Sequence, residues 1–195
     1  MMRLWIVAFG LAVMPSLAAA QIGNPAGLAP DTRFKAPGVP EANQTNYQDR
    51  LFAQLMTAGG LAEVDLGKLA VSKTDHQGIR AYAQQMIDSH GKANKALGSI
   101  AEKSRMPVPA EPGEDQKMAR SHIDGLKGRE FDLAYLANQV VEHQKAASLL
   151  AWEIGSGEDA ALQRFAMETL PTVLEHLQMA RDLTAELTLQ AQAAK

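Results

Sequence analysis

The sequence predicts an all-α chain whose four long helices form a bundle. Apolar residues recur at three- and four-residue steps along four segments, and no segment alternates with period two between turn residues. Short turns join the first segment to the second and the third to the fourth. Helices joined by short turns lie antiparallel, so we expect two antiparallel helical hairpins linked by a longer crossover, running up, down, down and up.

The chain begins with a predicted signal peptide over residues 1–20. The segment MMRLWIVAFGLAVMPSLAAA has one positive charge at Arg3, then an apolar run, and small residues at Ala18 and Ala20, which is typical of a cleavable leader. Residues 21–45 contain four prolines and three glycines without sustained periodicity. This composition predicts a flexible tether before the folded domain, residues 46–195.

The first hairpin follows from two capping patterns. Thr45-x-x-Gln48 is a capping-box pattern and predicts a helix that continues to about Lys73. Thr74-x-x-Gln77 opens a second helix, which ends before the prolines at 107, 109 and 112. The pair Gly59-Gly60 costs the first helix about 1 kcal/mol per glycine relative to alanine. We therefore expect another helix to approach closely at this pair.

The crossover and the second hairpin come next. Helical character resumes near Glu114, with a break at Gly125 or Gly128. A third long helix is predicted from about Arg129 to Ile154, and Gly155-Ser156-Gly157 ends it. The pattern Ser156-x-x-Asp159 then opens a helix that continues almost to Lys195. We expect Pro171 to kink this last helix, because proline removes a backbone donor.

The composition excludes several classes of protein. The formal net charge is −3 with scattered lysines and arginines, so nucleic acid is not an expected partner. No apolar run after the leader approaches the length of a membrane span, and with no cysteine the domain must be held by packing. The sequence also lacks the Gly-x-Ser-x-Gly motif of serine nucleophiles, a glycine-rich nucleotide-binding loop and the His-Glu-x-x-His motif of zinc proteases. We expect a binding protein rather than an enzyme.

Each predicted helix has an ionisable residue on its apolar face. The inward positions are Glu63, His90, His143 and His176, with Asp132 as a supporting group on the helix of His143. Buried ionisable groups cost several kcal/mol unless they are paired or ligated. Two interpretations stay open: a buried hydrogen-bond network, and a site for one transition metal ion, for which three imidazoles and a carboxylate suit Zn, Cu or Fe.

The heights of these residues agree only in part. Counted from the turn near Thr74, Glu63 and His90 stand at similar levels. Counted from Gly157, His143 and His176 differ by about five residues, or roughly 7 Å at the helical rise. This difference counts against the metal interpretation, although helix ends shift by several residues.

Four segments resemble one bacterial family, the domain of unknown function 4142. They are EVDLGKLA from Glu63, AQQMIDSH ending at His90, FDLAYLANQVVEH ending at His143, and LPTVLEHL around His176. The resemblance spans about Tyr47 to Leu187 and implies an exported protein with a ferritin-like four-helix bundle. The family is often labelled an outer-membrane protein. Ferritin-like di-iron proteins use Glu-x-x-His pairs, which this sequence lacks, so the resemblance implies no di-iron chemistry here.

Taken together, these observations predict an exported, periplasmic or secreted helical bundle. Its role would be that of a binding or envelope-associated module, with an envelope protein as its partner. The alternative is a periplasmic metal-binding or redox protein that uses Glu63, His90, His143 and His176. The sequence leaves the oligomeric state open.

Overall fold

The computed structural model describes residues 45–193, which contain five α-helices. These are α1 (Tyr47–Lys73), α2 (Gln77–Lys103), α3 (Glu114–Asp124), α4 (Gly128–Ser156) and α5 (Ala160–Ala193). The prediction of an all-α chain is confirmed over this range, and no helix in it is long and apolar enough to cross a membrane. The expected signal peptide and nearly all of the expected tether lie outside the described residues.

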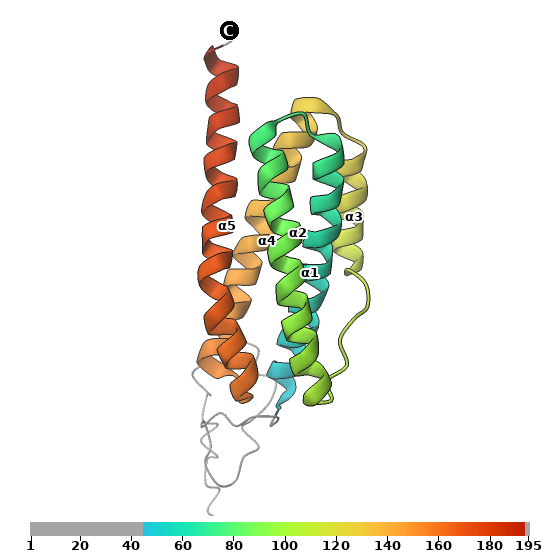
Figure 1. Cartoon of the computed structure of the whole chain (residues 1–195), viewed down its shortest axis with the longest axis vertical. Helices are drawn as coiled ribbons and strands as arrows, with labels where there is room; N and C mark the ends of the chain where they lie inside the picture. The colour runs from blue at the N-terminus through green and yellow to red at the C-terminus, as the bar shows by residue number, and fades with distance from the viewer. Residues whose placement is uncertain (1–44, 194–195) are drawn as a thin grey trace, which may run out of the picture.

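The long helices are arranged in pairs. α1 packs along α2, α4 packs along α5, and the pairs meet where α1 contacts α4 and α2 contacts α5. In Figure 1 the chain runs upward in α1, down in α2, down in α4 and up in α5. The shorter α3 covers α1 and α4, and it occupies the crossover whose start near Glu114 the sequence indicates.

The first helix is capped one residue later than the sequence pattern suggests. The Asn46 side chain accepts a hydrogen bond from the backbone N–H of Asp49 at 2.9 Å, and the Asp49 carboxylate accepts one from the N–H of Asn46 at 2.7 Å. Asp49 is fully buried and also accepts the backbone N–H of Glu158 at 2.9 Å. A shared carboxylate therefore ties the start of α1 to the turn between α4 and α5.

The caps of α2 and α5 also differ from the expected ones. Thr74 ends α1 instead of opening α2, and the Nδ1 atom of His76 accepts the N–H of Ile79 at 3.2 Å as the true cap of α2. Ser156 is still part of α4, and Asp159 caps α5 by accepting the N–H of Ala161 at 2.8 Å. In each case several residues of capping type stand close together, and packing decides at which of them the helix begins or ends.

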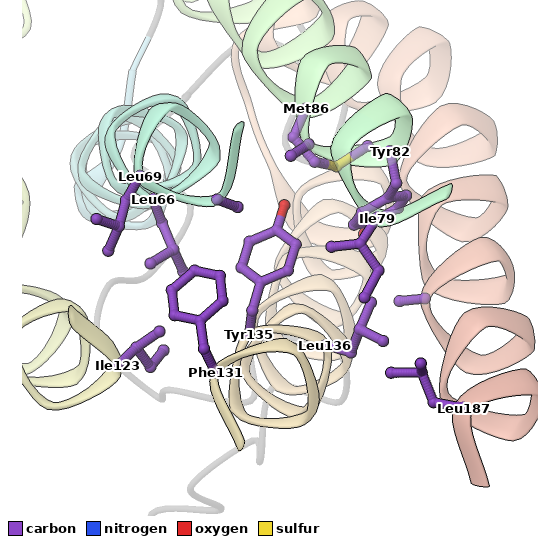
Figure 2. Packing of buried hydrophobic residues seen from close by; sticks show 13 residues of the cluster. Leu66, Leu69, Ile79, Tyr82, Met86, Ile123, Phe131, Tyr135, Leu136 and Leu187 are labelled. Carbon is purple, nitrogen blue, oxygen red and sulfur yellow. The ribbon is translucent and has the colours of Figure 1, made fainter. Parts of the chain in front are cut away.

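Two apolar clusters make up the core. Figure 2 shows the first, near the α1–α2 turn, where the rings of Phe131 and Tyr135 lie parallel with centroids 6.3 Å apart. The second cluster, at the opposite end of the long helices, is built around Phe52, Leu150 and Phe165. On every long helix the inward ionisable residue lies between the segments that supply these clusters. These inward residues thus form one polar layer between the two apolar clusters, and further buried acidic groups, among them Asp49, Asp132 and Glu153, lie toward the helix ends.

Close approach between α1 and α2 depends on glycines of α1. A Cβ atom added at Gly60 would lie 2.0 Å from the Asn94 side-chain oxygen, whereas one at Gly59 would meet only Gln116 at 3.7 Å. The expected close approach is therefore found at Gly60 alone of this pair. Gly67, further along α1, is also closely packed: an added Cβ would lie 2.9 Å from Ile87 and 3.0 Å from the carbonyl oxygen of Ala83.

We expect the substitution Gly67→Ala to lower the free energy of unfolding by about 1–3 kcal/mol, the usual cost of overpacking. The backbone carbonyl of Ala83 cannot move away as a flexible side chain could. Gly98→Ala in α2 is the matched control, because nothing lies within 4 Å of its added Cβ. The control should raise the free energy of unfolding by up to about 1 kcal/mol through helix propensity. Chemical denaturation of both variants would contradict this packing if their stabilities changed in the same direction.

Candidate functional site

Three histidines from three helices meet in the polar layer. His90 of α2, His143 of α4 and His176 of α5 are all buried, with 9%, 1% and 1% of their surface exposed. Their ring centroids lie 5.4–5.6 Å apart. One nitrogen from each ring can be chosen so that all three lie within 4.8 Å of one another. The structure thus brings together three of the four residues that the sequence suggests as metal ligands.

Two features reduce the difference in height between His143 and His176. His143 lies 13 residues before the end of α4 at Ser156 and His176 lies 16 residues after the start of α5 at Ala160, so counts from these ends differ by three residues and not five. The direction in which side chains leave a helix reduces it further. Each Cα–Cβ bond tilts toward the N-terminus of its own helix. Since α4 and α5 run in opposite directions, the side chain on one helix leans toward the side chain on the other. The count of about five residues compares backbone levels and leaves out this tilt, whereas the two rings are 5.4 Å apart.

The orientation of His143 is set by the backbone. Its Nδ1 atom lies 2.9 Å from the carbonyl oxygen of Gln139, which can only accept a hydrogen bond. Nδ1 therefore carries the proton in the neutral ring, and Nε2 keeps a free lone pair. In the metal-free protein this Nε2 atom can accept a hydrogen bond from the Nε2–H group of His90, 3.4 Å away. Two imidazole nitrogens consequently point at one place in the core.

Glu63 stands beside the histidines rather than among them. Its Oε1 atom is 3.9 Å from Nδ1 of His143, the nitrogen on the opposite side of the ring from His90. Its Oε2 atom accepts a hydrogen bond from the side-chain amide of Gln139 at 2.7 Å, and Gln139 in turn accepts the hydroxyl of Tyr82 at 3.0 Å. In this arrangement Glu63 contacts His143 from its Nδ1 side and does not take part in the contact between the two Nε2 atoms.

Gln139 is the member of the network that the sequence analysis missed. It is fully buried and contacts Glu63, Tyr82 and, through its backbone carbonyl, His143. The signal was available, because Gln139 precedes His143 by one helical turn and therefore shares its face. The apolar neighbour Val140 fits the same spacing and hides the polar residue in the pattern.

Asp132, expected to support the site, lies elsewhere. Its carboxylate accepts the hydroxyl of Thr74 at 2.5 Å, at the turn between α1 and α2. Asp132 precedes His143 by three helical turns, so about 16 Å of helix separates them. Both residues share the inner face of α4, as the sequence predicts, but helical spacing fixes a face and not a common level. The expectation of a supporting role for Asp132 is wrong.

Burial keeps the three imidazoles neutral. It lowers the pKa of His90 to about 3, with further lowering by charge on His143 and His176. The pKa of His143 falls to about 4 for the same first reason, although the Gln139 carbonyl opposes the shift. The pKa of His176 also falls to about 4 through burial and the charge of His143. All three rings are therefore unprotonated at neutral pH, the form that binds metals.

Burial shifts the nearby carboxyl group the other way. The pKa of Glu63 rises to about 8 because the charged form loses its water, a shift that Gln139 opposes and Glu142 adds to. Glu63 is thus mostly protonated at neutral pH when no cation is nearby, and its contact with His143 is not an ion pair. A bound cation would favour the carboxylate and lower this pKa.

The donor set suits a tetrahedral transition metal ion. Zinc–imidazole bonds of about 2.0–2.1 Å at tetrahedral angles place ligand nitrogens about 3.3–3.4 Å apart. The Nε2 atoms of His90 and His143 already have this separation, at 3.4 Å. His176 is buried, yet neither of its ring nitrogens has a hydrogen-bond partner in the described chain. An ion between the rings would give His176 the partner that it lacks.

The metal-free protein should be most stable near pH 6.5. Below this pH the histidines bind protons more readily in the unfolded chain than in the folded protein, because their pKa values are lowered in the folded protein. Stability is therefore lost as the pH falls. Glu63 and Glu153, with pKa values raised from 4.5 to about 8 and 9, hold protons only in the folded state between these values, so their contribution to stability falls as the pH rises from about 4.5. The three histidines outweigh this loss below about pH 6.5, and above it the loss is no longer offset. Burial is the first cause for Glu153, and Asp49 adds to it.

Chemical denaturation of the metal-free protein between pH 5 and pH 9 measures this profile. Each proton that differs between the two states contributes a slope of about 1.4 kcal/mol per pH unit. Glu63→Gln should make the decline above pH 6.5 shallower, and His122→Ala, at an exposed histidine of α3, should leave the profile unchanged. Stability that rises steadily to pH 9 would contradict the buried, protonated carboxyl groups.

Comparisons with known proteins agree with the fold. A DUF305 fragment from Deinococcus radiodurans has a similar structure, with a TM-score of 0.65 and 14% identity over 73% of this chain and 98% of that one. A Streptomyces coelicolor structure described as "putative secreted protein DUF305" has a TM-score of 0.64 and 15% identity, over 72% of this chain and 92% of that one. At these identities only the fold is shared. Curated protein sequences give no match. The family described as "Domain of unknown function (DUF4142)" matches residues 34–183, and the chain therefore belongs to it.

Proposed function

We propose that this protein is an exported metal-binding domain, which holds one transition metal ion between His90, His143 and His176. The observation that carries the proposal is the convergence of three buried, neutral imidazoles from three helices within 4.8 Å. Glu63 would support the ion from the next layer, through His143 and Gln139. Such outer partners orient ligating histidines and raise their basicity.

A hydrogen-bond network alone explains only part of the layer. It accounts for Tyr82, Gln139, Glu63, His143 and His90: the first four are linked by hydrogen bonds of 2.7–3.0 Å and by the 3.9 Å contact between Glu63 and His143, and His90 can donate to His143 at 3.4 Å. It gives no role to His176, whose two nitrogens are buried without partners. Leaving a buried polar group unsatisfied costs about 1–3 kcal/mol. Coordination to a metal removes this cost, and a network does not.

The chemistry of the donors selects the kind of ion. Imidazole nitrogen suits Zn, Cu and Fe, whereas Mg and Ca prefer oxygen ligands. Three nitrogens at one point hold one ion, and the sequence lacks the Glu-x-x-His pairs of a di-iron centre. The proposal is therefore a mononuclear site. When bound, the ion would supply Lewis acidity or, for Cu or Fe, a redox couple; the chain's own residues bind and orient it.

The location and the finer architecture belong to the same proposal. A leader-like segment over residues 1–20 and the similarity to a DUF305 structure described as secreted both support export to the periplasm or the medium. The paired long helices support a ferritin-like four-helix bundle. A role at the cell envelope is consistent with these features, with the metal ion as the partner that the site is built to hold.

We expect the native protein to bind one Zn²⁺ or Cu²⁺ ion per chain, and His176→Leu to abolish tight binding. Because His176 has no hydrogen-bond partner, its replacement by an apolar residue should leave the metal-free protein at least as stable as the native one. Free metal at about 100 times Kd should raise the free energy of unfolding of the native protein by about 2.7 kcal/mol. Elemental analysis and metal-dependent denaturation measure these effects.

His122→Ala is the matched control, because His122 lies exposed on α3 away from the polar layer. This variant should bind metal as the native protein does. The proposal would be overturned if native protein exposed to Zn²⁺ and Cu²⁺ stayed free of metal, or if His176→Leu bound as tightly as the control. A marked loss of stability in metal-free His176→Leu would favour a structural role for the ring.

A further inference from the structure

We propose that the metal ion keeps one open coordination position, which faces a small cavity and takes a neutral hydrogen-bond donor, water in the first place. This inference rests on the proposed metal site and adds the ligand class that the site accepts. The cavity lies at the seam of α1 and α4 and has a volume of about 30 Å³. A cavity of about 10–15 Å³ is enough to hold one water molecule.

The position of the cavity relative to the histidines indicates where the open position lies. His90 and His143 both border it, together with Met56, Glu63, Glu142 and Ala146. His176 is not among the described residues that line it. His90 and His143 thus border both the cavity and the place where the three rings meet, so an ion held by their Nε2 atoms would lie next to the cavity. Three protein ligands and one exchangeable position are typical of catalytic rather than structural zinc sites.

The charges around the cavity select the ligand. Two carboxyl groups, of Glu63 and Glu142, border it, and no lysine or arginine is among its lining residues. Glu142 keeps 17% of its side-chain surface exposed and is held by Lys145 at 2.7 Å. With the metal ion bound, Glu63 is a carboxylate, and the two carboxylates repel an anion in the cavity; this repulsion is strong where little water is present. An anionic ligand is thus disfavoured.

Hydrogen bonding favours a donor at the same place. The Oε2 atom of Glu63 accepts the amide of Gln139, whereas Oε1 lies 3.9 Å from the nearest histidine nitrogen, beyond hydrogen-bond distance. A bound cation favours the carboxylate form of Glu63, and a ligand in the cavity that carries an O–H or N–H group can then donate to this oxygen. The size and the lining together fit water, or a neutral molecule of one or two heavy atoms with a proton to donate.

The test uses Cu²⁺-loaded protein, since Cu²⁺ has the highest affinity of the divalent ions for nitrogen sites. Pulsed electron paramagnetic resonance in D₂O should detect the deuterons of one exchangeable bound water in the native protein. Ala146→Leu fills the cavity without removing a ligand and should lose this signal while still binding one Cu²⁺ per chain. Ala151→Leu places the same side chain at an exposed position of α4 and should keep the signal.

Azide provides the second measurement. The native Cu²⁺ protein should bind azide weakly, and Glu142→Gln should bind it about tenfold more tightly, because one repelling charge is removed. Metal binding without exchangeable water, or equal azide affinity in the native and Glu142→Gln proteins, would overturn the open position or its preference for neutral ligands. Failure of every variant to bind Cu²⁺ would instead remove the metal site itself, and this inference with it.

Discussion

Burial of three imidazole rings at one level of the helix bundle is the constraint on which the rest of the site depends. Burial lowers the pKa of each ring, so His90, His143 and His176 stay neutral, and each has an unprotonated nitrogen that a metal ion could bind. The same burial leaves both nitrogens of His176 without a partner in the described chain. A single metal ion would use all three lone pairs at once. Burial of the three rings thus destabilises the metal-free protein and at the same time creates the set of nitrogen donors for a metal ion.

The level at which the rings meet is fixed by the packing at the two ends of the long helices. One apolar cluster, with Phe131 and Tyr135, lies on one side of the polar layer, and the other, with Phe52 and Phe165, lies on the opposite side. Polar contacts hold each end in register: Thr74 donates to Asp132 at the α1–α2 turn, and Asp49 accepts the N–H of Glu158 at the α4–α5 turn. Sliding one helix by a turn would move its histidine by about 5.4 Å and separate the rings.

The fold and the site differ in how far the sequence alone predicts them. The helices follow from apolar periodicity, which is strong over long segments, and the inward positions of the three histidines follow from the same period. Periodicity gives the face of a helix and not its level, so it placed Asp132 on the same face as His143, three turns away, without showing that its partner is Thr74. Gln139 was missed because Val140 fits the apolar pattern equally well. Caps were misplaced where neighbouring residues of capping type compete.

The most direct test of the central claim is X-ray absorption spectroscopy at the metal edge of the Zn²⁺-loaded native protein. Coordination by the buried histidines predicts a first shell of light atoms at about 2.0–2.1 Å, with the outer-shell scattering that three imidazole rings produce. A fourth light atom should complete this shell. A shell made of oxygen atoms alone, with no imidazole scattering, would place the ion on surface carboxylates and contradict the buried three-histidine site.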